Sequence, residues 1–286
     1  RAAVEQVDEA LDCSDSLALF SALQNSSLAL TGLIRDHAGW YLEQLTSDRE
    51  QKALDLGCVD PLERDELQEG VSVANEEAQR DRTLQQAVCK INEAVQRGEA
   101  RQTVRALMNT DAHLPDVYPF AAELYQRELA PLHACVCMQG ELQQEELFVA
   151  VEMLSAVALV NQAVEVQDFG AFSATLLSPA AGLADIDDSL MQRYFEQLCE
   201  LKRRAGKALL SWNDLQTGLN AVNSAAHEEH EQILTIGLIN QALSRSDPQK
   251  TLSALMLASS GLQDIFPLNA RRYHDVLTRA KRHKAE

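Results

Sequence analysis

The feature that most constrains the fold of this chain is a spacing pattern that occurs four times without a gap. From Ala94, Leu107 follows after 13 residues and Tyr125 after 31, and the same spacing starts at three other alanines. Four of the five tyrosines fall on its last position. A repeat over tens of residues indicates an array of equivalent structural units. The repeat anchors are Ala10, Leu23, Tyr41, Ala94, Leu107, Tyr125, Ala163, Leu176, Tyr194, Ala242, Leu255 and Tyr273.

The composition indicates that these units are helical. Hydrophobic residues make up 46% of the chain and aromatic residues only 5%. Ala, Leu, Gln and Glu, which are good helix formers, are abundant, while the β-branched runs and Asn-Gly or Asp-Gly pairs typical of hairpins are scarce. We therefore predict an all-α fold with enough apolar residues to bury a core.

Each copy of the repeat carries an acidic residue five positions after its alanine anchor. A carboxylate at this place can accept hydrogen bonds from the free backbone N–H groups that begin a helix, and it opposes the helix dipole. The position therefore predicts a short helix that starts directly after each acid, followed by a further helix that carries the tyrosine. The four acids are Asp15, Glu99, Asp168 and Asp247.

Longer helical patterns precede the second and fourth copies. Asp60 and Ser211 are predicted helix caps, each with an acid three positions later, and the periodicity continues to Arg97 and Ser244. Before the third copy the pattern is 11 residues shorter, and because 11 residues make almost three helical turns, both ends keep the same face. The missing part corresponds to the polar middle of the two longer helices, at 76–83 and 224–231, here called the waist. We expect the waist to face solvent. Four positions match 148 residues apart: Leu67 and Leu215, Gly70 and Gly218, Val71 and Leu219, and Asn75 and Asn223.

Together these patterns predict an extended array of four three-helix modules linked by long helices. The chain begins at Arg1 without a methionine, inside a copy, and we expect it to be a fragment of a longer protein. The predicted modules are 1–57 (truncated at its N-terminus), 58–139, 140–209 (with the shortened long helix) and 210–286.

Charge and cysteine content exclude several classes of protein. The net charge of -18 argues against binding to nucleic acid or to an acidic membrane surface. Six cysteines without a C-x-x-C spacing favour a reducing cytosol. The apolar run from Leu147 to Val164 contains Glu152 and Asn161 and is interpreted as a buried core helix rather than a membrane span. We expect no membrane insertion.

The sequence contains no motif that predicts catalysis or a cofactor. The phosphate-binding glycine motifs and the G-x-S-x-G nucleophile elbow are missing. His227 and His230 lie on one helix face among glutamates, but no third ligand is evident, and a solvated face explains them better than a metal site. His133, Cys135 and Cys137 are interpreted as a loop with incidental cysteines. We therefore predict no enzyme, no catalytic residue, no metal and no cofactor.

The repeated tyrosines and the two tryptophans are assigned to packing. A buried tyrosine ring with its hydroxyl at the surface of the unit is the favoured interpretation of the repeated position. Trp40 and Trp212 have no equivalents in the other copies; partner contacts are an alternative, but packing where units meet is favoured.

Six stretches of the chain resemble the internal-repeat region of the IQGAP family of scaffold proteins, and the resemblance covers essentially all 286 residues. In that family this region lies between a calponin-homology domain and the WW and IQ regions. The resemblance implies self-association or partner docking, including a homodimer, in the cytoplasm at the cytoskeleton or cell cortex. The stretches are DPLERDELQEGV, VYPFAAELYQREL, AVEMLSAVALVNQAV, RYFEQLCELK, SWNDLQTGLNAVN and EEHEQILTIGLINQAL.

The family's binding partners are implied only for other parts of the parent protein. F-actin, calmodulin, and Rac and Cdc42 bind through the calponin-homology domain, the IQ motifs and a GAP-related domain, and neither an IQ-x-x-x-R-G stretch nor a WW pattern occurs here. The predicted function is a non-enzymatic spacer that offers a protein-interaction or self-association surface in a cytoskeletal and small-GTPase signalling scaffold. The alternative is a helical-repeat adaptor that binds partner peptides in a groove between modules.

Overall fold

Helices account for the regular structure of the protein, in a computed structural model that describes residues 2–58, 60–136, 140–206 and 208–284. Within these ranges there are twelve α-helices, several short 3-10 turns and no strand, which confirms the all-α prediction. In chain order the helices are α1 (Ala2–Asp12), α2 (Ser16–Leu23), α3 (Ala38–Leu56), α4 (Arg64–Arg97), α5 (Ala100–Leu107), α6 (Ala122–Val136), α7 (Gln144–Glu165), α8 (Phe169–Leu176), α9 (Met191–Ala205), α10 (Trp212–Ser244), α11 (Pro248–Leu255) and α12 (Ala270–His283).

The repeated acids lie at the beginnings of the short helices, as their spacing predicts. The side chains of Asp15, Asp168 and Asp247 accept backbone N–H groups of the first turns of α2, α8 and α11. Glu99 occupies the same N-cap position before α5, but its carboxylate accepts from the side chain of Gln102 and not from a backbone N–H of the first turn. The residue before each acid has a left-handed backbone, which glycine adopts most easily and which lets the preceding helix end abruptly. These residues are Ser14, Gly98, Gln167 and Ser246, with φ of 51°, 80°, 57° and 53°.

Three of the four predicted ends of the long helices are confirmed. Helices α4 and α10 end at Arg97 and Ser244, and Ser211 caps α10 with its hydroxyl on the backbone N–H of Asp214. The predicted start of α4 at Asp60 is wrong. The helix begins after Glu63, because the buried side chain of Leu62 holds the preceding residues in a linker that packs on the core.

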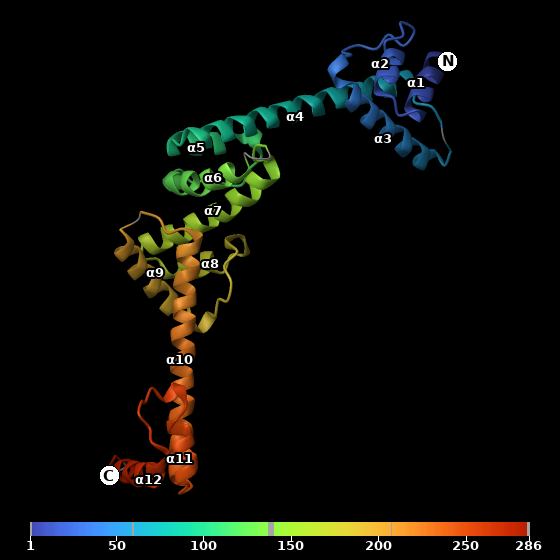
Figure 1. Ribbon diagram of the computed structural model, residues 1–286. Coiled ribbons are helices and arrows are strands. Elements are labelled where there is room, and N and C mark those ends of the chain that lie inside the picture. Colours follow the sequence, from blue (N-terminus) through green and yellow to red (C-terminus); the bar gives the residue numbers. More distant parts are fainter. Residues whose placement is uncertain (1, 59, 137–139, 207, 285–286) are drawn as a thin grey trace. The chain divides into compact units, whose positions relative to one another are not determined.

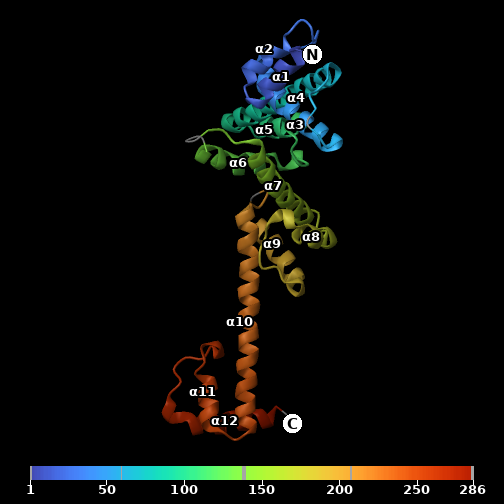
Figure 2. The same ribbon diagram turned by 90° about the vertical axis from the view of Figure 1, so that its right-hand side faces the viewer.

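The contacts of the chain fall into two units, residues 1–151 and 152–286. In the first unit, α4 packs its beginning on α3 and its end on α5 and α6 (Figure 1). In the second unit, α10 packs its beginning on α9 and its end on α11 and α12 (Figure 2). Each long helix thus contacts two copies of the repeat. The division into four modules stays a prediction.

The waist of each long helix is largely exposed. Most residues of 76–83 in α4 and of 224–231 in α10 lie at the surface, although Ala78 is buried. In α10 the waist also carries an ion pair, in which Arg193 of α9 donates to both carboxylate oxygens of Glu229 at 2.7 and 2.8 Å. Because both side chains are exposed to solvent, this pair contributes little to stability.

The repeat anchors lie in the core. The alanine, leucine and tyrosine anchors of the first three copies are all buried, and so are Ala242 and Leu255 of the fourth. Tyr273, the tyrosine of the fourth copy, is half-buried. Helix α7 is long and apolar enough by composition to cross a membrane, and 61% of its apolar window is buried inside the protein, which favours a core helix.

Candidate functional site: the helix junctions

The repeated tyrosine holds the irregular segment that precedes its own helix. In each copy its hydroxyl accepts a hydrogen bond from the backbone N–H seven residues earlier, at 2.9, 3.1, 3.1 and 3.2 Å along the chain. A buried hydroxyl needs such a partner, because an unpaired one costs about 1–3 kcal/mol. Burial, opposed by these hydrogen bonds, raises the pKa of Tyr41. The tyrosine therefore acts as a structural clamp.

An asparagine on the following long helix completes the clamp in two copies. The Tyr41 hydroxyl donates to Asn75 Oδ1 at 2.7 Å, and Asn75 Nδ2 donates to the carbonyl of Gly32 at 2.8 Å. Asn223 repeats this arrangement in α10: it accepts from Tyr194 at 2.5 Å and donates to the carbonyl of Asp185 at 2.8 Å. The asparagine pairs noted in the sequence therefore join each long helix to the copy before it.

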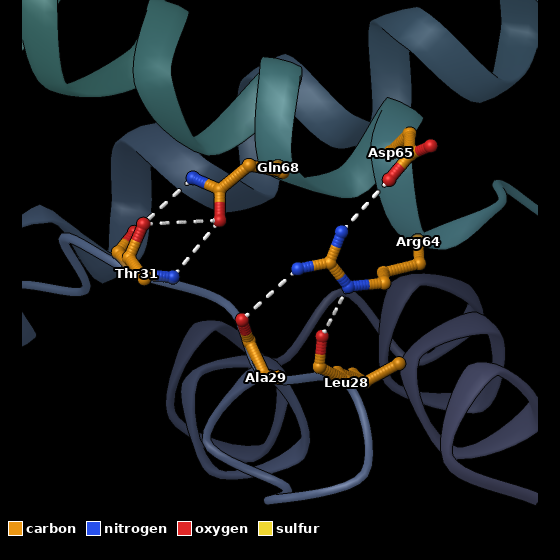
Figure 3. A network of polar contacts seen from close by, with 6 residues as sticks. All are labelled: Leu28, Ala29, Thr31, Arg64, Asp65 and Gln68. Atoms are coloured by element: carbon orange, nitrogen blue, oxygen red, sulfur yellow. Dashed lines mark hydrogen bonds and ion pairs between the residues drawn. The ribbon is translucent and has the colours of Figure 1, made fainter.

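A glutamine about two turns earlier in the long helix binds the backbone of the same segment (Figure 3). Gln68 accepts from the N–H of Thr31 at 2.9 Å and donates to its carbonyl at 3.2 Å. Gln216 makes the same pair of bonds with Ala184, again at 2.9 and 3.2 Å. Because a side-chain amide matches a backbone amide in both donor and acceptor, this contact fixes the register of the helix on the segment.

The first residue of each long helix donates to the carbonyl at one fixed repeat position. Arg64 Nε donates to the carbonyl of Leu28 at 2.8 Å, and its guanidinium also reaches Ala29 (Figure 3). The indole N–H of Trp212 donates to Ala181 at 2.9 Å. Leu28 and Ala181 both lie 18 residues after their alanine anchors, so Arg64 is the equivalent of Trp212. The expectation that Trp212 has no counterpart is wrong, because arginine and tryptophan supply the same N–H donor.

The two helical glycines allow each long helix to lie close to the preceding copy. A Cβ atom at Gly70 would sit 2.4 Å from Leu45 Cδ2, and one at Gly218 would sit 2.7 Å from Leu198 Cδ2. Leu45 and Leu198 are equivalent positions, 35 residues after their anchors, and both are fully buried. Glycine is therefore required here by close approach of the helix to a packed leucine side chain.

The linkers before α7 and α10 each have a buried asparagine anchor before the helix begins. Asn92 accepts from the N–H of Leu142 at 3.0 Å and donates to its carbonyl at 2.9 Å, and Asn161 does the same with Leu210 at 2.6 and 2.9 Å. Both asparagines lie two residues before their anchor alanine, and both leucines lie two residues before a long helix. These bonds hold the linker that leads into α7 and α10.

Charged groups surround the junction of α3 and α4. Lys52 Nζ donates to a carboxylate oxygen of Glu66 at 2.7 Å and to the carbonyl of Pro61 at 2.9 Å. The hydrogen bond to Glu66 raises the pKa of Lys52. Burial opposes ionisation of Glu66, but the bonds from Lys52 and from the Glu63 N–H outweigh it and lower the pKa of Glu66. Burial raises the pKa of Asp48, and the neighbouring glutamates on α4 raise it further.

The chain is similar along nearly its whole length to two human proteins and one mouse protein. It is 50% identical over 286 residues to the human Ras GTPase-activating-like protein IQGAP3, and 35% identical over 291 residues to human IQGAP2. Mouse IQGAP2 is 34% identical over 299 residues. Each alignment covers 99% of this chain. The chain is a segment of the IQGAP family. It spans 17–18% of the length of these curated relatives. No family model and no solved structure matches it.

The other candidate residues of this IQGAP segment do not form a site in the part that the structure describes. His227 and His230 are exposed, and the described residues contain no group of three metal-ligating side chains. Cys135 is exposed, His133 is buried, and Cys137 lies outside the described residues. Trp40 is partly buried against the core of the first copy.

The junction residues of the IQGAP segment were only partly evident from its sequence. The recurrence of Gly70 and Asn75 was visible, because identical residues lie 148 positions apart. The same comparison also pairs Gln68 with Gln216. A pattern built on apolar anchors does not include this polar pair. The resulting signature occupies twelve consecutive positions, at 64–75 and 212–223. It begins with a side-chain N–H donor, and after two variable residues it continues with Leu-Gln-x-Gly and an apolar residue. Two further variable residues, an apolar residue and Asn complete it.

Proposed function

We propose that this IQGAP segment is a non-enzymatic part of a cytoskeletal and small-GTPase signalling scaffold, in which it spaces other domains and offers a surface for proteins or for a second copy of itself. The observation that carries the proposal is the pair of long helices, α4 and α10, each of which contacts the preceding copy of the repeat through the same signature and the following copy through its other end. In an array of quasi-equivalent units, a helix that packs on two neighbours sets the spacing between them.

The role in the parent protein follows from membership of the family. The relatives are named Ras GTPase-activating-like proteins, a name that belongs to proteins about six times as long as this segment. We propose that actin, calmodulin and Rac or Cdc42 bind through other domains of the parent, at the cytoskeleton or cell cortex. The segment itself needs no cofactor in this proposal.

The spacer function predicts an extended particle. A compact protein of this length has a radius of gyration of about 19 Å by the usual scaling. Small-angle scattering of the 286-residue chain should give a clearly larger value at the lowest concentrations measured. A value near that of a sphere would refute the spacer.

Self-association is tested separately by light scattering across a concentration series. A mass that rises from one chain toward two would support a self-association surface within these residues. A constant mass of one chain would leave the spacer in place and would refute self-association by this segment.

A further inference from the structure

The fourth copy has the surface that a long helix covers in the first and third copies, but no helix lies on it in the described residues. Between the segment 262–266 and α12 there is an open groove of about 430 Å³. Its apolar lining is Leu255, Leu262, Ile265, Tyr273, Val276 and Leu277. By repeat position Tyr273 and Leu277 are the equivalents of the tyrosines and leucines that α4 and α10 contact in the first and third copies.

Side chains of this groove are more exposed than their equivalents in the copies that a long helix covers. Leu45 and Leu198 are fully buried beneath Gly70 and Gly218, whereas their equivalent Leu277 is only half-buried. Leu262 is 54% exposed, while the corresponding leucines of the first and third copies are partly buried. Val276 beside it is 52% exposed. A contiguous apolar groove of this kind on a soluble surface marks an interaction site.

The polar groups of the junction are also present and available. The Tyr273 hydroxyl accepts from the N–H of Phe266, but within the described ranges it has no asparagine to which it donates. The backbone of Gln263 occupies the repeat position of Thr31 and Ala184, whose backbones glutamines bind in the other copies. Asn240 corresponds to the buried Asn92 and Asn161, yet it is exposed.

The charge around the groove fits the same kind of helix. Lys284 occupies the repeat position of Lys52, which binds the acid in the first turn of α4. Helix α12 ends in Lys281, Arg282 and His283, within a chain of net charge -18. Arg272, which lines the groove, and Lys284 favour a helix with acidic residues in its first turn, as in α4 and α10.

We propose that this groove of the fourth copy docks one further helix, which carries the signature Leu-Gln-x-Gly-apolar-x-x-apolar-Asn preceded by an acid and an apolar linker residue. The helix comes from outside the 286 residues, because both segments of the chain that carry the signature are already seated on the first and third copies. The apolar linker residue binds Asn240, the glutamine binds the backbone of Gln263, and the asparagine accepts from Tyr273.

The inference deepens the proposed function by naming the chemistry of one partner surface, and it rests on that function. The two can fail separately. A chain that gives the scattering of an extended particle but does not bind such a helix would retain the spacer and lose this docking site.

The test uses the complete chain and a fluorescently labelled peptide of residues 209–226, which contains Leu210 and the whole signature of α10. We expect saturable binding by fluorescence anisotropy. The covalently attached α10 keeps its own site on the third copy, because its effective local concentration far exceeds that of a free peptide. Replacing Gly218 by Leu in the peptide should weaken binding at least about tenfold, since the larger side chain cannot approach Leu277.

Matched variants of the chain locate the site. Leu262→Asp should weaken peptide binding at least about tenfold, and Tyr273→Phe, which keeps the ring, by about three- to tenfold. Leu257→Asp is the control, because Leu257 is similarly exposed but lines a different groove, between α10 and α11. It should change binding less than twofold. Circular dichroism establishes that each variant is folded.

Three outcomes would overturn the proposal. They are no binding of the peptide to the chain, equal loss of binding in Leu262→Asp and Leu257→Asp, and a dimer of the chain that Leu262→Asp dissociates but the peptide does not. The last outcome would assign the groove to a second copy of this chain.

Discussion

At the scale of single residues, the junctions depend on a glycine that leaves space for a neighbouring side chain and on an asparagine that pairs two buried backbone groups. Gly218 lacks a Cβ atom where Leu198 needs the space, and Asn161 satisfies both backbone groups of Leu210. The chain also contains a residue of the same type as each that makes no such contact. Gly237 lies in the same helix as Gly218 with nothing within 4 Å, and Asn240 occupies the repeat position of Asn161 at the surface.

Gly218→Ala and Gly237→Ala should therefore change stability in opposite directions. Alanine favours a helix over glycine by up to about 1 kcal/mol, so Gly237→Ala should stabilise the protein. In Gly218→Ala the new methyl group must displace Leu198, and overpacking costs about 1–3 kcal/mol, which leaves a net loss. Urea unfolding of the two variants measures both signs. Stabilisation of similar size in both would show that the close approach carries no energetic cost.

Asn161→Ala should destabilise the protein by about 2–4 kcal/mol, because it leaves the N–H and carbonyl of Leu210 buried without partners. Asn240→Ala, the surface control at the same repeat position, should stay within about 0.5 kcal/mol of the unmodified chain. Thermal and urea unfolding of each variant give the comparison. Equal effects would mean that the linker finds other hydrogen bonds when Asn161 is removed.

At the scale of helices, the sequence predicted where short helices start and where long ones end, since caps and breaks are local chemistry. Asp247 followed by Pro248 specifies a helix start from neighbouring residues alone. The start of α4 was missed, because the position of Leu62 is set by its burial against distant residues. Arg64 and Trp212 were not recognised as equivalent, since their shared N–H donor is apparent only when the acceptor carbonyl is in view.

The stability of the junction of α3 and α4 should depend on pH through two carboxyl groups whose pKa values are shifted in opposite directions. Asp48 has a raised pKa when folded, so the stability it contributes is present at low pH and is lost as the pH rises through that pKa. Glu66 has a lowered pKa, so its contribution is present at neutral pH and is lost as the pH falls through it.

Asp48→Asn should therefore become more stable relative to the unmodified chain between pH 4 and pH 7, and Glu66→Gln less stable over the same range. The asparagine retains an oxygen that can accept the 2.8 Å bond from Gln44 Nε2. Denaturant unfolding at the two pH values measures both differences, and each variant serves as the control for the other. Parallel changes in the two variants would contradict the assignment of these carboxyl groups.

At the scale of the whole molecule, the copies should differ in local stability according to whether a long helix covers them. The third copy has α10 on its tyrosine and on the segment before it, while the described residues of the fourth have no such cover. Local opening exposes backbone hydrogen bonds at a free energy that depends on the packed contacts around them. The fourth copy should therefore open more easily than the third, although both have the same anchors.

Hydrogen exchange followed by mass spectrometry measures this difference directly. Amides of the segment 262–266 and of α12 should exchange at least roughly tenfold faster than those of 183–187 and α9, the ratio given by about 1.4 kcal/mol of opening free energy. Saturating the chain with the 209–226 peptide should slow exchange in the fourth copy and leave the third unchanged. Equal exchange in the two copies without peptide would mean that the covering helix contributes little, and that the signature residues set geometry without adding stability.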